Sequence, residues 1–100
     1  MAVYSLVRFA VRAEAREVVE RALHEHASFV RRELAAVTWT AYRDPQAPLH
    51  FTALVRSEDP AASRRERDAF VTMITPHLDG ALVVEGCDLV TSSDLGRRHR

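Results

Sequence analysis

The 100-residue chain lacks several residue types on which common protein chemistries depend. All 14 basic residues are arginine, so no lysine is present to form a Schiff base or to bind phosphate in a P-loop. The three glycines (Gly80, Gly86 and Gly96) cannot supply the GxGxxG motif of dinucleotide-binding proteins. The single cysteine, Cys87, excludes an intramolecular disulfide and a zinc site built from several cysteines. We therefore expect neither a metal ion nor a cofactor.

Charge and hydropathy exclude two further kinds of partner. The 14 basic residues are balanced by 14 acidic ones, whereas a general nucleic-acid binder carries a clustered basic excess. No apolar run approaches the roughly 18 residues that span a bilayer. Arg8 and Arg12 interrupt the apolar N-terminal stretch, which is not the layout of a signal peptide. The sequence thus predicts no nucleic-acid or membrane partner and a cytoplasmic location.

Hydrophobic periodicity predicts the first four elements. Residues 3–12 alternate as a strand does. Over residues 14–36 an apolar stripe recurs at three- and four-residue spacing, which indicates an amphipathic helix. Strands are predicted at 37–43 and 49–56, because both segments are rich in β-branched and aromatic residues. The turn between them, 44–48, contains two prolines that cannot continue a strand ladder.

The remaining elements complete a known order. A second helix begins at residues 59–60, where an Asp-Pro pair supplies an N-cap and a first-turn proline. Ser63 and Glu66 fit a second capping box, which predicts a break near residues 64–67. A last strand follows at 81–90. The order β-α-β-β-α-β predicts a ferredoxin-like α+β fold, an antiparallel sheet with both helices on one face.

This fold leaves the other face of the sheet bare. That face carries Tyr4, Leu6, Tyr42 and Leu54 among polar residues. Exposed apolar patches usually mark contact sites, and a two-fold pairing covers such a patch with one self-complementary surface. We therefore predict a homodimer through the bare sheet face. Residues 1–92 form its single domain, and residues 93–100 form a flexible basic tail.

Four segments carry a family resemblance: WTAYRDP at 39–45, PLHF at 48–51, DAF at 68–70 and PHLDG at 76–80. With the element order, they resemble the antibiotic biosynthesis monooxygenase (ABM) domain family of dimeric α+β barrels. The resemblance implies a cofactor-independent oxygenase that acts on an electron-rich aromatic, polyketide-like or quinol substrate in a pocket between sheet and helices. Haem-degrading members carry an Asn on the first strand, and this chain has none.

His26 and Trp39 are the candidate catalytic residues. His26 lies near the centre of the apolar helix stripe, and strand parity points Trp39 toward the helices. A histidine titrates near neutral pH, which suits a general base, and an indole offers a stacking surface or an N–H donor. Both residues also fit a structural role, His26 as a hydrogen-bonded core histidine and Trp39 as a core aromatic.

Other residues are expected to line a substrate pocket. The small residues Ser5, Ala41 and Ala53 predict a cavity of about a few hundred Å³ between His26 and Trp39. The candidate substrate-binding residues are Ser5, Phe9, Phe51, Phe70, Met73 and His77; His77 alternatively caps the second helix. Two other functions stay open: a cyclase that uses the same pocket and base without oxygen, and a non-enzymatic ligand-binding or structural dimer.

Overall fold

A computed structural model describes residues 2–93 of the chain, so residues 94–100 of the predicted tail lie outside the described residues. The order of elements matches the sequence prediction. The elements are β1 (Val3–Ala10), η1 (Ala13–Ala15), α1 (Arg16–Glu33), β2 (Val37–Asp44), β3 (Ala47–Ser57), α2 (Pro60–Ile74), η2 (Thr75–His77) and β4 (Val83–Cys87). Within the described residues, no helix is both long and apolar enough to cross a membrane.

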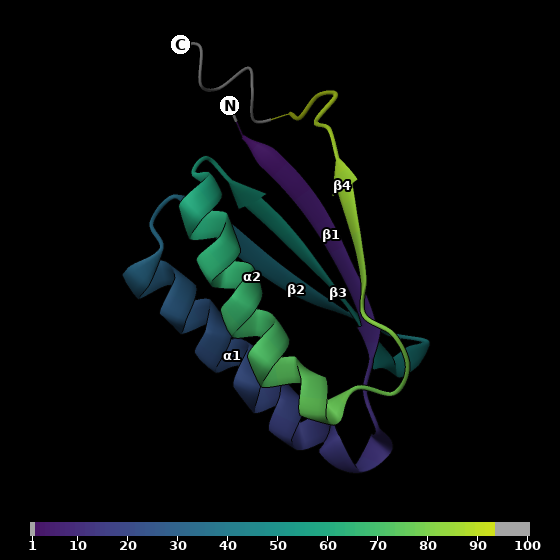
Figure 1. Ribbon diagram of the computed structural model, residues 1–100. Coiled ribbons are helices and arrows are strands. Elements are labelled where there is room, and N and C mark those ends of the chain that lie inside the picture. Colours follow the sequence, from purple (N-terminus) through teal and green to yellow (C-terminus); the bar gives the residue numbers. More distant parts are fainter. Residues whose placement is uncertain (1, 94–100) are drawn as a thin grey trace.

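The four strands form one antiparallel sheet in the order β2-β3-β1-β4. Both helices pack on the same face of this sheet (Figure 1). In each βαβ unit the two strands are not neighbours: β3 lies between β1 and β2, and β1 lies between β3 and β4. This is the split arrangement of the ferredoxin-like α+β fold. The predicted fold class is confirmed.

The hydrophobic core lies between the sheet and the helices. Because successive strand residues alternate between faces, Val7 and Phe9 point into this layer together with Phe51. The ring of Phe9 stacks on Phe51 with centroids 5.5 Å apart, and it meets Phe70 of α2 edge-on at 5.4 Å. These aromatic contacts join β1, β3 and α2 at one end of the layer.

The hairpin turn between β2 and β3 is tighter than predicted. Asp44 pairs with Ala47, and the Asp44 carboxylate accepts a hydrogen bond of 2.9 Å from the backbone N–H of Gln46. Pro48, which was predicted to lie in the turn, belongs to β3. It lies where the β2–β3 register shifts, so its missing N–H costs the ladder no hydrogen bond.

Helix α2 runs unbroken from Pro60 to Ile74, so the predicted break is wrong. The Asp59 carboxylate caps the helix by accepting a hydrogen bond of 3.1 Å from the N–H of Ala61. Glu66 is buried in the core instead of forming a capping box with Ser63. After η2 the chain turns at Gly80, whose φ of 99° is a conformation that L side chains rarely adopt.

Candidate functional site

A buried histidine and a buried glutamate connect the two helices. On α1 the buried residues Val19, Leu23, His26 and Val30 recur every three or four positions, so His26 faces the core as predicted. Its Nε2 atom lies 2.8 Å from Oε2 of Glu66 on α2. His26 is 5% exposed and Glu66 is 2% exposed, so this hydrogen bond is screened from solvent.

Aromatic rings surround the imidazole. Trp39 of β2 meets it edge-on at a centroid distance of 4.9 Å, and Phe70 of α2 does so at 5.4 Å. Phe29, one turn along α1, lies 5.9 Å away. Few polar partners are available in such surroundings, so the carboxylate of Glu66 determines how the ring is oriented.

The pair has the arrangement of an oriented base. The hydrogen bond of the imidazole to Glu66 is made by Nε2, which leaves Nδ1 as the other ring nitrogen. When Nε2–H donates to the carboxylate, Nδ1 carries the free lone pair and can accept a proton. An imidazolium formed there would be stabilised by Glu66, as in the histidine–carboxylate pairs of enzymes. This chemistry needs a substrate close to Nδ1.

A cavity of about 360 Å³ lies beside this pair, between α1 and β2. Its wall contains apolar and polar side chains, including the predicted site residues Trp39 and Phe51. The lining residues are Glu20, Leu23, His24, Ala27, Trp39, Thr40, Ala41, Tyr42, Arg43 and Phe51. The volume is typical of a small-molecule site. Trp39 lines this cavity and also contacts His26, which does not itself line the cavity.

This cavity differs in place from the predicted one. The space between His26 and Trp39 is filled, because their rings touch edge-on. Of the three small residues expected to leave room, only Ala41 lines the cavity. Ala53 is fully buried between two neighbouring strands, and Ser5 lies on β1, away from α1.

An ion pair lies in the polar part of the cavity wall. Nη1 of Arg43 on β2 lies 2.6 Å from a carboxylate oxygen of Glu20 on α1. This hydrogen bond, supported by Arg16, lowers the pKa of Glu20 below its ordinary value, although burial opposes the shift. The charges are partly solvated, so the pair adds more to the polarity of the cavity than to stability.

Trp39 also carries an unsatisfied donor. Its indole Nε1 is buried and has no hydrogen-bond partner among the described residues. A buried N–H without an acceptor costs about 1–3 kcal/mol, and such groups usually have a reason. Other atoms of the residue line the cavity, so an oxygen atom of a bound ligand would satisfy this N–H only after the ring turns.

The other predicted site residues do not line this cavity. Phe9 and Phe70 belong to the buried core, and Met73 packs against it. The hydroxyl of Ser5 is contacted by Arg67. His77 lies in η2, where its backbone C=O accepts a hydrogen bond of 3.0 Å from Arg12. Their roles in substrate binding stay predictions.

Glu66 is the candidate site residue that was not predicted from the sequence. Its signal was present, because the buried residues of α2 are spaced four apart: Ala62, Glu66, Phe70 and Ile74. An acidic residue within such an apolar stripe indicates a buried partner on another element. In residues 2–93 no three His, Cys, Asp or Glu side chains gather as a possible metal site.

Known structures share this fold, although no protein-family model and no curated protein matches the sequence. A Bacteroides thetaiotaomicron protein classed as an antibiotic biosynthesis monooxygenase aligns with a TM-score of 0.79 and 17% identity, over 92% of each chain. A Caulobacter crescentus protein of the same class aligns with a TM-score of 0.77 and 16% identity, over 90% of this chain and 91% of that one. A mutant of SnoaB from Streptomyces nogalater, described as a cofactor-independent oxygenase, aligns with a TM-score of 0.71 and 20% identity, over 92% of this chain and 96% of that one. The chain therefore has the fold of ABM proteins, as the sequence resemblance predicted.

Proposed function

We propose that the protein is a small cofactor-independent oxygenase that acts on an electron-rich aromatic, polyketide-like or quinol substrate. The observation that carries the proposal is the buried His26–Glu66 hydrogen bond next to Trp39, which lines a largely apolar cavity. The fold shared with ABM proteins and with SnoaB supports the reaction class. The substrate binds between α1 and β2, with its ring against Trp39.

His26 acts as the base in the first step. Its Nδ1 accepts the proton of an acidic O–H or C–H group of the substrate, and Glu66 stabilises the resulting imidazolium through Nε2. The substrate is left as an anion whose charge is delocalised over its rings. The indole N–H of Trp39, which has no partner in the described residues, donates to the anionic oxygen.

Dioxygen is the oxidant in the second step. The electron-rich carbon of the anion bonds to one oxygen atom, and the proton held by His26 returns to the distal oxygen to give a hydroperoxide. Loss of water from the hydroperoxide leaves a carbonyl group. The substrate therefore loses two hydrogen atoms and gains one oxygen atom, and the second oxygen atom leaves as water.

This mechanism requires Trp39 to move. The indole lies between the imidazole and the cavity, so Nδ1 reaches the substrate only when the ring turns aside. Ala27 and Ala41 line the same wall, and their small side chains leave room for the turn. Catalytic contacts that tighten only with substrate bound are common in enzymes.

Oxygen uptake tests the proposal. Anthrone and 1,4-naphthohydroquinone are offered to the wild type, to His26→Gln and to the control His50→Gln, which changes an exposed histidine of β3 that does not line the cavity. We expect uptake by the wild type and the control and at least a 100-fold loss in His26→Gln, the range of general base catalysis. Binding of these compounds without uptake would instead favour the ligand-binding module or the cyclase.

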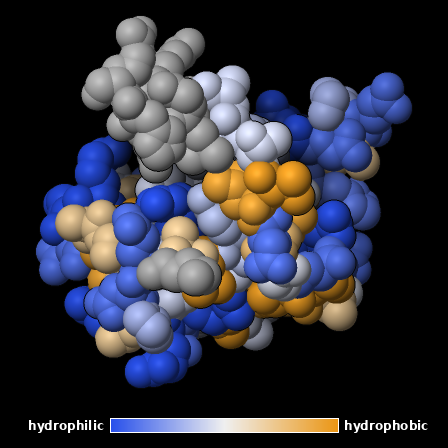
Figure 2. Space-filling model, turned by 90° about the horizontal axis from the view of Figure 1, so that it is seen from above, coloured by the Kyte–Doolittle hydropathy of each residue, from blue (hydrophilic) through white to orange (hydrophobic). Residues whose placement is uncertain are grey.

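We also propose that two copies pair through the bare face of the sheet. The support is apolar surface on that face: Tyr42 is 58% exposed and Val83 is 45% exposed, and Leu54 of β3 lies on the same face, where it pairs with Leu6. Figure 2, which views the molecule from above, shows apolar patches among hydrophilic residues. Sedimentation should give a dimer for the wild type and for Val18→Glu on α1, and a monomer for Leu54→Glu. A monomeric wild type would refute the pairing.

A further inference from the structure

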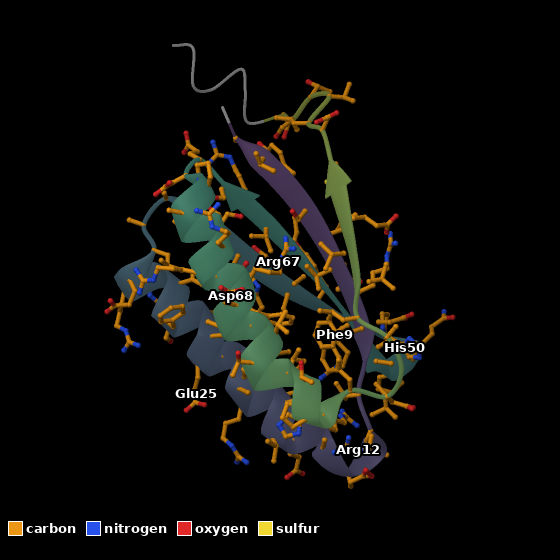
Figure 3. The ribbon with its side chains drawn as sticks, viewed as in Figure 1. Phe9, Arg12, Glu25, His50, Arg67 and Asp68 are labelled. Atoms are coloured by element: carbon orange, nitrogen blue, oxygen red, sulfur yellow. The ribbon has the colours of Figure 1, made fainter. Side chains whose placement is uncertain are left out.

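Arg67 of α2 is a half-buried cation without a counter-ion. Its side chain extends toward β1 (Figure 3), where Nη2 donates a long hydrogen bond of 3.4 Å to the hydroxyl of Ser5. Its Nε is buried and has no acceptor, and no carboxylate among residues 2–93 lies within ion-pair distance. An unpaired guanidinium in such a place is costly, because desolvation is not offset by an opposite charge.

Open space lies next to this arginine. Ser5 pairs with Gly86 of β4, so both face the helices. A Cβ atom added at Gly86 would meet no other atom within 4 Å. Val84 shares this face, because it pairs with the core residue Val7, yet it is 39% exposed. The helix-facing side of β4 is thus uncovered, and a solute can approach Arg67 there.

We propose that Arg67 and Ser5 bind the carboxylate group of a small organic acid in the space over β4. The guanidinium offers paired N–H donors with the spacing of two carboxylate oxygens, and the buried Nε–H gains its missing acceptor. Ser5 contributes its hydroxyl proton as a further donor. One guanidinium neutralises one carboxylate, whereas a phosphate dianion would leave excess negative charge in a half-buried place.

This site is separate from the proposed oxygenase cavity. Trp39, Val55, Ser5 and Gly86 form one row across the sheet, from β2 to β4. Neighbouring strands lie about 4.8 Å apart, which places Ser5 about 10 Å from Trp39. Binding at Arg67 therefore requires no oxygenase activity, and it is measured without turnover.

Calorimetric titration with benzoate tests the site, with benzyl alcohol as the uncharged probe. We expect benzoate to bind and benzyl alcohol to bind at least ten-fold more weakly. Arg67→Gln should weaken benzoate binding at least ten-fold, whereas Arg64→Gln, which removes an exposed charge from the same helix, should not. Gly86→Leu should weaken binding as well, because a Cβ atom here meets no other atom and the larger side chain occupies the open space.

Thermal unfolding without ligand separates this role from a structural one. If Arg67 is a ligand-binding residue, Arg67→Gln should leave the thermal unfolding midpoint unchanged or raise it, because an unpaired buried charge is removed. A lower midpoint would overturn the proposal in favour of a structural arginine. Wild-type protein that binds no benzoate, or an Arg67→Gln variant that binds it as well as the wild type, would also overturn it. Inorganic phosphate binding in place of benzoate would refute the carboxylate assignment.

Discussion

The imidazole of His26 and the carboxylate of Glu66 lie 40 residues apart in the chain and 2.8 Å apart in the structure. They connect the inner faces of α1 and α2 by a hydrogen bond that solvent does not reach. Removing one partner leaves the other buried and unsatisfied. The same hydrogen bond therefore has two roles. It holds the two helices in register, and it orients the imidazole ring that we assign as the base.

A double-mutant cycle should show this coupling. His26→Leu and Glu66→Leu are each expected to lower the free energy of unfolding by about 1–3 kcal/mol, the cost of a buried polar group without a partner. The double variant should lose less than the sum, by about 1 kcal/mol or more, because it leaves no orphaned group. Urea unfolding followed by circular dichroism gives these values.

The exposed neighbour supplies the control for this cycle. His24→Leu, at an exposed position of the same helix, should change stability by no more than about 0.5 kcal/mol. Strictly additive effects of His26→Leu and Glu66→Leu would mean that the contact contributes nothing of its own.

The Glu20–Arg43 pair predicts a feature of the acid stability profile. The pKa of Glu20 is lowered in the folded protein, chiefly by the hydrogen bond from Arg43, so folding favours the ionised carboxylate. This contribution is fully present above the ordinary value of 4.5 and is lost as the pH falls through the lower pKa of the folded state. Glu20→Gln should therefore lose less stability than the wild type on acidification below that value.

The effect of Glu20→Gln on stability at neutral pH should be small, because the side chains of Glu20 and Arg43 are 35% and 44% exposed. Unfolding midpoints recorded across the acid range for both proteins check the prediction. Parallel profiles for the wild type and Glu20→Gln would show that the ion pair does not persist in solution.

Periodicity predicted the parts of the site that depend on a single element. The helical repeat placed His26 on the inner face of α1, and strand alternation placed Trp39 toward the helices; both placements are seen in the structure. The same reasoning gave the six main elements in order, because each buries one face with its own period.

Contacts between side chains of different elements could not be predicted from periodicity. Glu66 fitted a local capping box equally well, and only the packing of α2 on α1 brings it to His26. The predicted cavity was displaced for a similar reason, because the orientation of the Trp39 ring decides which side of it stays open. That Arg67 lacks an ion-pair partner could not be predicted from the sequence, because it depends on where the carboxylates of other elements lie in the fold.

Trp39 is the only tryptophan of the chain, so its fluorescence reports directly on the cavity. Anthrone should change the emission of the wild type on binding. Ala41→Leu, which fills the same wall, should weaken this binding about ten-fold or more without loss of folding. Ala13→Leu, exposed in η1, is the matched control and should bind as the wild type does. Equal affinities for all three proteins would place the ligand elsewhere.

The most direct test of the central claim is an anaerobic absorbance titration of anthrone, whose conjugate base absorbs visible light. Without oxygen the reaction stops after proton transfer, so the spectrum reports on the base alone. We predict the band of the anion with the wild type and with His50→Gln, whose exposed side chain lies outside the cavity. We predict its loss with His26→Gln, while Trp39 fluorescence shows that anthrone still binds. An anion band of equal strength with His26→Gln would contradict the assignment of His26 as the base.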